Sequence, residues 1–411
     1  MEGRILTSID VGTSKVCTTI ARMKDGYISE ILGTGVVPSH GIQKAIVLDI
    51  HEPAVAIRES VREAERSSHT QVKSAFIGIT GHHVASLNNR GALTFAQPNH
   101  RVSDKDIDRA IGFSKDLSLP KQTRVIHAIP RQYFLDGRVA SASPVGLHGH
   151  RLEVETHVVT AGITFIQNLT ECVQSARIGV MDLILEPLAS AEAVLEDEEK
   201  EAGVILVDIG AGTTDVTVYK GRTIWYSRAL PLAGNNVTRD IAVGLGVPFS
   251  MAEELKMKYG SVAVEKKTMP RFIDLDHGEN RRVPYEEFCR IIEARLEEIM
   301  GMVLSGLPPG LWKPWEPASL VLCGGTANLP GIEALAQEVS QLRVRIGRPR
   351  GLPERMVTLH DPAYATGIGL LLWGAKYGQS KVTSTEGVLQ RFFDRLAKWH
   401  FKWPGIKFGM S

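Results

Sequence analysis

Two short segments of this chain each place an aspartate, glycines and hydroxyl side chains after an apolar run. The first contains Asp10, Gly12, Thr13, Ser14 and Lys15, and the second contains Asp208, Gly210, Gly212, Thr213 and Thr214. Glycine lets backbone N–H groups approach an anion closely, and successive turn amides form a concave anion site. Hydroxyls add donors, Lys15 can reach a phosphate oxygen, and aspartates can hold Mg²⁺ through water, because this ion keeps much of its hydration shell. The pattern predicts two phosphate-binding turns that share a divalent cation.

The elements around these turns repeat. Each turn lies between two β-rich runs, residues 5–11 and 15–20 in the first case and 204–209 and 215–219 in the second. Each therefore predicts a strand, a tight glycine turn and a second strand. One such turn alone would more simply end a strand. Two of them, each at the start of one half of the chain, favour phosphate binding and duplication of a whole domain.

Three further segments predict elements that accompany the two phosphate turns. Residues 179–195 predict a short strand, then Glu186 and Pro187, then a helix of small residues in whose first turn proline is tolerated. Residues 319–335 predict a buried strand, a double-glycine turn and a helix. Residues 361–372 predict a capped helix whose small residues suit close contact with another helix.

In this order, the five segments resemble the five nucleotide motifs of the actin/Hsp70/sugar-kinase superfamily. The resemblance implies an α/β fold, with two actin-like lobes around a cleft that holds ATP and Mg²⁺. It implies that Asp10 and Asp208 hold Mg²⁺ through water and that Glu186 orients the attacking water, although a carboxylate at a helix N-terminus is also favoured by the helix dipole alone. The implied nucleotide contacts are Gly12, Thr13, Ser14, Lys15, Gly210, Gly212, Thr213 and Thr214 at the phosphates, Gly324, Gly325 and Thr326 at the purine, and Glu253 and Lys256 at the ribose and adenine. Glu253 and Lys256 share one helix face, so a surface ion pair is the alternative.

Residues 84–160 read as a compact α+β insertion, with a helix that Ser103 caps and several strands. The phrases at 78–83, 129–133 and 144–153 are similar to those of the bacterial division protein family FtsA. This resemblance implies the following domains: 1–83 and 161–198 as the first lobe (1A), 84–160 as an inserted subdomain (1C), 199–233 and 318–375 as the second lobe (2A), and 234–317 as its smaller subdomain (2B).

The C-terminal segment has a different character. A polar linker, 376–386, precedes an amphipathic helix predicted over 387–403. One face carries Leu389, Phe392, Phe393, Leu396, Trp399 and Trp403, and the other carries Arg391, Arg395, Lys398 and Lys402.

This helix is too polar to cross a bilayer and suits its interface. The apolar gain roughly cancels the ordering entropy, and the basic residues, at about 1 kcal/mol each near anionic lipid, tip the balance. A single copy should bind weakly, so stable attachment needs several copies held together. The alternatives are a helix packed on its own domain and calmodulin-type capture.

Composition excludes several classes of protein. Of 411 residues, 43% are hydrophobic and 23% charged, and Lys+Arg 47 against Asp+Glu 46 leaves no global field that would select nucleic acid. No run of eighteen apolar residues predicts a spanning helix, and the first residues leave no room for a signal peptide. The four cysteines lack metal-ligand spacing, which favours a reducing cytoplasm. The arginines between 343 and 355 are expected to form a solvated rim.

The FtsA resemblance implies a function as well as a fold. It implies a division protein that polymerises into filaments on the cytoplasmic face of the cell membrane and tethers FtsZ there, with at most slow ATP hydrolysis. The C-terminal peptide of FtsZ would bind subdomain 2B, where Arg281, Arg282, Arg290 and Arg295 are candidates. The insertion would contact the next protomer or other divisome proteins. The alternatives are a small-molecule kinase of the same superfamily and an FtsA-like peptide-binding ATPase of pilus assembly.

Overall fold

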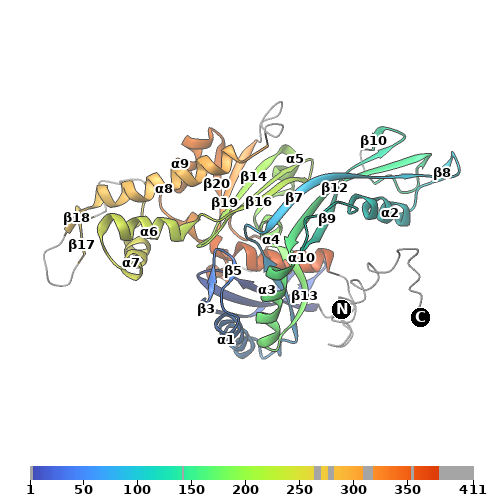
Figure 1. Ribbon diagram of the computed structural model, residues 1–411. Coiled ribbons are helices and arrows are strands. Elements are labelled where there is room, and N and C mark those ends of the chain that lie inside the picture. Colours follow the sequence, from blue (N-terminus) through green and yellow to red (C-terminus); the bar gives the residue numbers. More distant parts are fainter. Residues whose placement is uncertain are drawn as a thin grey trace, which may run out of the picture.

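Two five-stranded sheets form the centre of the protein (Figure 1). The computed structural model describes residues 3–140, 143–262, 270–275, 282–308, 318–352 and 356–378. In the first sheet the order is β13 (Gly179–Leu185), β6 (Ser74–Ile79), β1 (Arg4–Val11), β2 (Lys15–Lys24) and β3 (Tyr27–Pro38). In the second it is β16 (Thr223–Leu230), β15 (Thr214–Lys220), β14 (Val204–Ile209), β19 (Ser319–Cys323) and β20 (Arg343–Ile346).

The two sheets are built alike. In the first, β1 pairs antiparallel with β2 and parallel with β6. In the second, β14 pairs antiparallel with β15 and parallel with β19. The predicted pair of strand–turn–strand units is therefore confirmed, and each unit stands at the corresponding place in its own sheet.

Two helices of small residues join the lobes. Figure 1 shows α10 (Ala365–Tyr377) between the two sheets, where it packs on α4 (Glu186–Val194). A Cβ at Gly369 would lie 1.8 Å from the carbonyl oxygen of Ala189, so only glycine allows this approach. The expected close contact is confirmed. Leu188 and Leu370 belong to the same buried cluster as Leu206 of the second sheet.

Further helices cover each sheet. In the first lobe these are α1 (His51–Ser68) and α3 (Ile163–Ser175). In the second they are α5 (Asp197–Ala202) and α9 (Ile332–Ser340), while α6 (Gly234–Leu245), α7 (Phe249–Tyr259) and α8 (Tyr285–Ser305) extend outward from this lobe (Figure 1). Phe288, Ile292 and Leu296 on α8 follow the helical period and are fully buried. A small strand pair, β17 (Phe272–Asp274) and β18 (Arg282–Pro284), lies at the outer end of α8 in Figure 1.

The insertion is an α+β unit with its own core. Its sheet has the order β10 (Arg138–Ala140), β9 (Thr123–Leu135), β12 (Arg151–Gly162) and β7 (Val84–Thr94). Helix α2 (Asp104–Ser114) packs on this sheet, and β8 (His100–Arg101) pairs with β11 (His148–Gly149). Ser103 is the N-cap of α2, as predicted, and forms a capping box with Asp106, whose carboxylate accepts from the Ser103 backbone N–H at 3.0 Å.

The insertion contacts the outer strands of both central sheets. Against β13, the backbone N–H of Leu185 donates to Nε2 of His127 at 3.0 Å. Against β16, Nε2 of His157 lies 3.0 Å from Oγ of Ser227. The insertion therefore bridges the two lobes on the side opposite to α6–α8 (Figure 1).

Some predictions fall on residues outside the described part of the chain. These are the linker beyond residue 378, the amphipathic helix at 387–403 and Arg281. Within the part that is described, no helix is both long and apolar enough to cross a membrane.

Candidate nucleotide site

The two predicted phosphate turns face each other. Each is closed by the same hydrogen bond: the Gly12 N–H donates to Lys15 O, and the Gly210 N–H donates to Thr213 O, both at 3.0 Å. A Cβ at Gly212 would lie 2.4 Å from Oγ1 of Thr13, so the two turns are in contact. The fold therefore brings together two turns that are far apart in sequence.

Four carboxyl groups gather at these turns: Asp10, Glu186, Asp208 and Asp215. Burial raises the pKa of Asp10 to about 6, with Lys15 opposing and Asp208 adding to the rise. Burial, then the charge of Asp10, raises the pKa of Glu186 well above its usual range. The protein alone therefore disfavours full ionisation of this cluster, and a bound cation would reverse that preference.

Asp215 was not predicted as a site residue. It is 4% exposed, burial and then the charge of Asp208 raise its pKa to about 7, and Oγ1 of Thr80 donates to its carboxylate. A signal was available in the sequence, because Asp215 directly follows Thr213 and Thr214 of the second predicted phosphate turn.

Asp208 is held by hydroxyls from both connecting helices. Oγ of Ser190 on α4 donates to its carboxylate at 2.6 Å, and Oγ1 of Thr366 on α10 does so at 3.3 Å. Burial raises the pKa of Asp208, and these donors lower it. The aspartate therefore connects the second turn to the helices between the lobes.

Lys15, which is predicted to reach a phosphate oxygen, contacts the start of α10. Its ammonium donates to the carbonyl oxygen of Ala363 at 2.8 Å and lies 3.9 Å from the ring centroid of Tyr364. Lys15 thus joins the first turn to the start of α10, and a phosphate would have to compete with these two contacts.

The predicted adenosine residues lie beside the second turn. Gly324 has a φ of +84°, and a Cβ there would lie 2.4 Å from Oδ1 of Asp208. Oγ1 of Thr326 donates to Gly210 O at 2.9 Å. Glu253 and Lys256 form an ion pair at 2.7 Å. This pair contacts the start of α6, because Nζ of Lys256 donates to Gly234 O at 3.2 Å. Gly234 in turn lies against Thr326, since a Cβ at Gly234 would lie 2.6 Å from Oγ1 of Thr326. The structure therefore brings these residues together.

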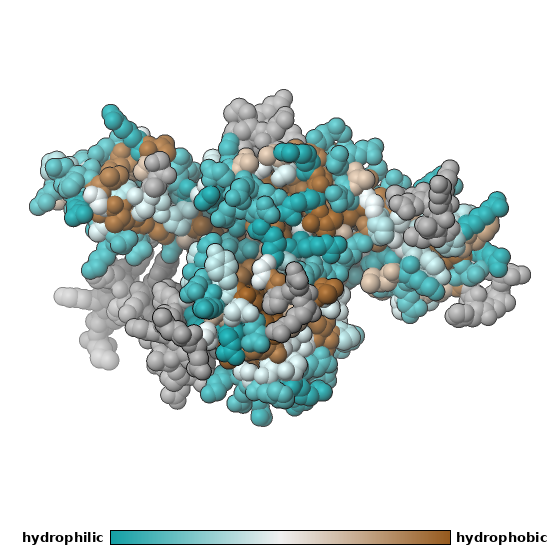
Figure 2. Space-filling model, turned by 180° about the vertical axis from the view of Figure 1, so that it is seen from behind, coloured by the Kyte–Doolittle hydropathy of each residue, from teal (hydrophilic) through white to brown (hydrophobic). Residues whose placement is uncertain are grey.

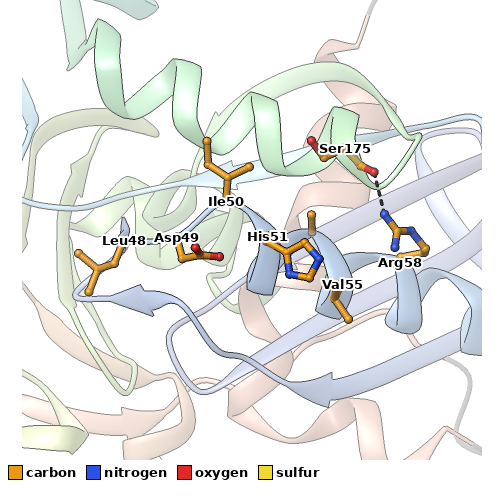
Figure 3. Close-up of a pocket in the computed structure, with 8 residues that line it drawn as sticks. Leu48, Asp49, Ile50, His51, Val55, Arg58 and Ser175 are labelled. Carbon is orange, nitrogen blue, oxygen red and sulfur yellow. Dashed lines mark hydrogen bonds between the residues drawn. The ribbon is translucent and has the colours of Figure 1, made fainter.

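A small cavity in the first lobe, of about 20 Å³, borders the first turn and is lined in part by Val11, Ala45, Thr80, His83 and Glu186. This volume suits a single water molecule. A larger cavity, of about 570 Å³, lies at the start of α1 (Figure 3). There Arg58 donates to Ser175 O at 2.9 Å, and none of the predicted nucleotide residues lines it.

Two further predictions concern metals and arginines. In the described ranges, no group of three or more His, Cys, Asp or Glu side chains is placed to bind a metal directly.

Of the candidate peptide contacts, Arg282 pairs with Asp274 at 2.7 Å, Arg290 is exposed on α8, and Arg295 donates to Asp240 at 3.0 Å.

Comparison with known proteins places this fold in a class. A "PilM-PilN type IV pilus biogenesis complex" superposes with a TM-score of 0.65 at 17% identity, covering 90% of this chain and 98% of that one. The ethanolamine utilization protein EutJ from Carboxydothermus hydrogenoformans follows with a TM-score of 0.52 at 15% identity, covering 91% of each chain. Together with the paired sheets and the insertion, these likenesses define an actin-like two-lobed α/β fold.

The sequence comparisons narrow the class. Residues 205–369 match the family model for cell division protein FtsA, and residues 81–160 match that for the SHS2 domain inserted in FtsA. Cell division protein FtsA of Pseudomonas aeruginosa is 34% identical over 376 residues, covering 90% of this chain and 89% of the relative. That of Neisseria meningitidis is 32% identical over 409 residues, covering 96% and 98%. That of Escherichia coli K12 is 29% identical over 382 residues, covering 90% of each. The chain belongs to the FtsA family of cell division proteins.

Proposed function

We propose that this protein is an ATP-binding, polymer-forming division protein that tethers FtsZ filaments to the cytoplasmic membrane. The observation that carries the proposal is the carboxylate cluster between two matching glycine turns. Buried carboxylates with raised pKa values mark functional sites, because the fold gains no stability from holding them together. A site of this charge and position suits Mg²⁺ with a nucleotide.

Within this proposal, each predicted site residue has a role. Asp10 and Asp208 hold Mg²⁺ through water, with Asp215 beside them. The two turns, 12–15 and 210–214, bind the phosphates, while residues 324–326 with Glu253 and Lys256 bind the purine and ribose. Glu186 orients a water molecule, and the small cavity that it lines supports this role. Nucleotide then acts mainly as a switch between the lobes that α4 and α10 join.

The partners follow from the parts outside this site. The FtsZ peptide binds subdomain 2B, with Arg282 and Arg290 as candidates because both are exposed. The Arg282–Asp274 pair is open to solvent, whereas Arg295 is largely buried against Asp240. The insertion contacts a further protomer or other divisome proteins. Support comes from exposed apolar side chains on it, Val139 at 57% and Leu147 at 51%, and Figure 2 shows apolar residues at this end of the molecule. The C-terminal segment 387–403 binds anionic lipid.

Calorimetry with ATP in Mg²⁺ tests the central site. Asp208→Ala should lower the affinity at least tenfold, because it removes a charge that the bound cation needs. Asp108→Ala, which removes an exposed carboxylate from α2, should leave it unchanged. Equal affinity in the Asp208 variant and the unmodified protein would contradict the site.

A further inference from the structure

A small hairpin stands at the junction of the two phosphate turns. Strands β4 (Ile42–Gln43) and β5 (Ile46–Val47) are joined by the two-residue turn Lys44–Ala45. Both turn residues have positive φ, +50° and +61°. Asparagine and glycine are the usual residues in such turns, whereas lysine and alanine adopt this conformation at a cost in backbone strain. Strain of this kind collects at functional sites, which makes the turn a candidate for function.

The tip of this hairpin touches both phosphate turns. A Cβ at Gly212 would lie 3.0 Å from the Cα of Lys44, and the Ala45 N–H is 3.5 Å from Oγ1 of Thr13. Ala45 also lines the small cavity beside Glu186. In Figure 1, β5 lies where the first lobe meets the second. The hairpin is therefore a third backbone segment at the point where the two turns meet.

Lys44 differs from the other lysines at this point, because its ammonium has no hydrogen bond, ion pair or ring contact among the described residues. Lys15 is held by Ala363 and Tyr364 on the side of α10. Lys256 is paired with Glu253 on the side of the purine. Among the described residues, Lys44 forms no ion pair, and its neighbour Ala45 lines the cavity that Glu186 also lines. A triphosphate on the two turns would bring negative charge to this place, and a lysine ammonium is a common partner for phosphate oxygens.

We propose that Lys44 binds the terminal phosphate of a nucleoside triphosphate. This inference rests on the proposed nucleotide-binding function and adds a residue to it. The strained turn holds the Cα of Lys44 between the two phosphate turns, and its flexible four-carbon side chain carries the ammonium to the phosphate oxygens. Because a diphosphate lacks the terminal group, Lys44 favours ATP over ADP and so reports which nucleotide is bound.

Calorimetry with Mg²⁺·ATP and with Mg²⁺·ADP tests this role. Lys44→Ala should weaken ATP binding about tenfold or more and change ADP binding by less than about threefold. Lys44→Arg, which keeps the charge, should retain most of the preference for ATP. Lys15→Ala serves as the comparison, and it should affect the two nucleotides about equally.

The outcomes separate this inference from the proposed function. If Lys44→Ala binds ATP as the unmodified protein does, while Asp208→Ala loses it, Lys44 has no such role and the nucleotide site stands. If the unmodified protein binds neither nucleotide, the proposed function fails and this inference with it.

A second variant separates the ammonium from the shape of the turn. Ala45→Gly relieves the positive φ and keeps Lys44. It should raise the thermal midpoint of unfolding and leave the affinity for ATP within about twofold. A tenfold loss of ATP affinity in Ala45→Gly would overturn the proposal, because it would assign the effect to turn geometry. Equal thermal midpoints of Lys44→Ala and the unmodified protein would show that a loss of binding is not a loss of fold.

Discussion

The carboxylate of Asp215 is buried where the fold keeps it poorly ionised. Its pKa is raised to about 7 from the usual 3.8. A group whose pKa is raised on folding stabilises the protein fully below its unfolded pKa, and this contribution is lost as the pH rises through the folded pKa. For this group the window runs from about pH 4 to pH 7, and three units correspond to an upper bound of about 4 kcal/mol.

Asp215→Asn should therefore stabilise the ligand-free protein above pH 7 and weaken its binding of Mg²⁺·ATP. Thermal unfolding between pH 4.5 and 8.5 measures the first effect: relative to the variant, the midpoint of the unmodified protein should fall up to about pH 7 and stay level above it. The buried histidines titrate alike in both proteins, so their contribution cancels in this difference. The pKa values of His127 and His157 are lowered to about 4 and 3, so they destabilise the fold only as the pH drops below about 6.5. An unchanged pH slope would contradict the prediction.

At this scale, sequence alone predicted residue types better than partners. Asp10 and Asp208 stand out because each ends an apolar strand before glycine. The contact of Lys15 with Ala363 spans 348 positions, and the contact of Lys44 with Gly212 depends on how two lobes meet. Such partners follow from tertiary packing, which local patterns do not contain.

At the scale of elements, the junction between the insertion and β16 is a closed hydrogen-bond chain. Nδ2 of Asn88 donates to Trp225 O at 3.1 Å. This orients the Asn88 amide so that Oδ1 of Asn88 accepts from Nδ1 of His157 at 2.8 Å. Nε2 of His157 then accepts from Oγ of Ser227 at 3.0 Å. Burial lowers the pKa of His157, and Arg131, which stacks 3.9 Å from the ring of Trp225, lowers it further. The neutral histidine is therefore built into the junction.

Ser227→Ala should loosen the insertion from the second lobe. It leaves Nε2 of His157 buried without a donor, which costs about 1–3 kcal/mol. Hydrogen exchange in β7 and β12 should become faster, while exchange in β1 and β14 should not change. Thr223→Ala is the matched control, because the Thr223 hydroxyl, on the same strand, bonds within the described ranges only to Lys220 O, at 3.0 Å. Equal exchange in both variants would contradict a role for this junction in holding the insertion.

Local patterns predicted most of the elements and few of their contacts. Helix α2 was predicted from its Ser103 cap, and helix α4 from the proline in its first turn. The two strand–turn–strand units were predicted from their glycines. The β4–β5 hairpin was missed, because its turn carries lysine and alanine where glycine or asparagine would signal it. The predicted solvated rim is exposed at Arg343, Arg348 and Arg350, and two of its arginines form ion pairs: Arg345, which is half-buried, with Glu199 at 2.6 Å and Arg350 with Glu196 at 3.1 Å. These pairs join β20 and the following loop to the start of α5, a contact that composition does not specify.

At the scale of the whole molecule, the proposed function requires a weak lipid anchor and a polymer that depend on each other. The apolar face predicted at 387–403 gains roughly what its ordering costs, so the four basic residues decide whether a single copy binds. At about 1 kcal/mol each near anionic lipid, they give an affinity that holds one protomer only briefly. Protomers linked in a filament share the membrane, so each bound tail raises the effective concentration of the next.

Co-sedimentation with anionic liposomes tests this dependence. The bound fraction should rise steeply with protein concentration in Mg²⁺·ATP and gradually without nucleotide, because only a filament binds with many tails. Deletion of 387–411 should abolish sedimentation and leave ATP affinity unchanged. Replacing Arg391, Arg395, Lys398 and Lys402 by glutamine should have nearly the same effect, since it removes about 4 kcal/mol of attraction per tail. Sedimentation that survives the deletion would assign membrane binding to another part of the protein. Equal curves with and without nucleotide would separate membrane binding from polymerisation.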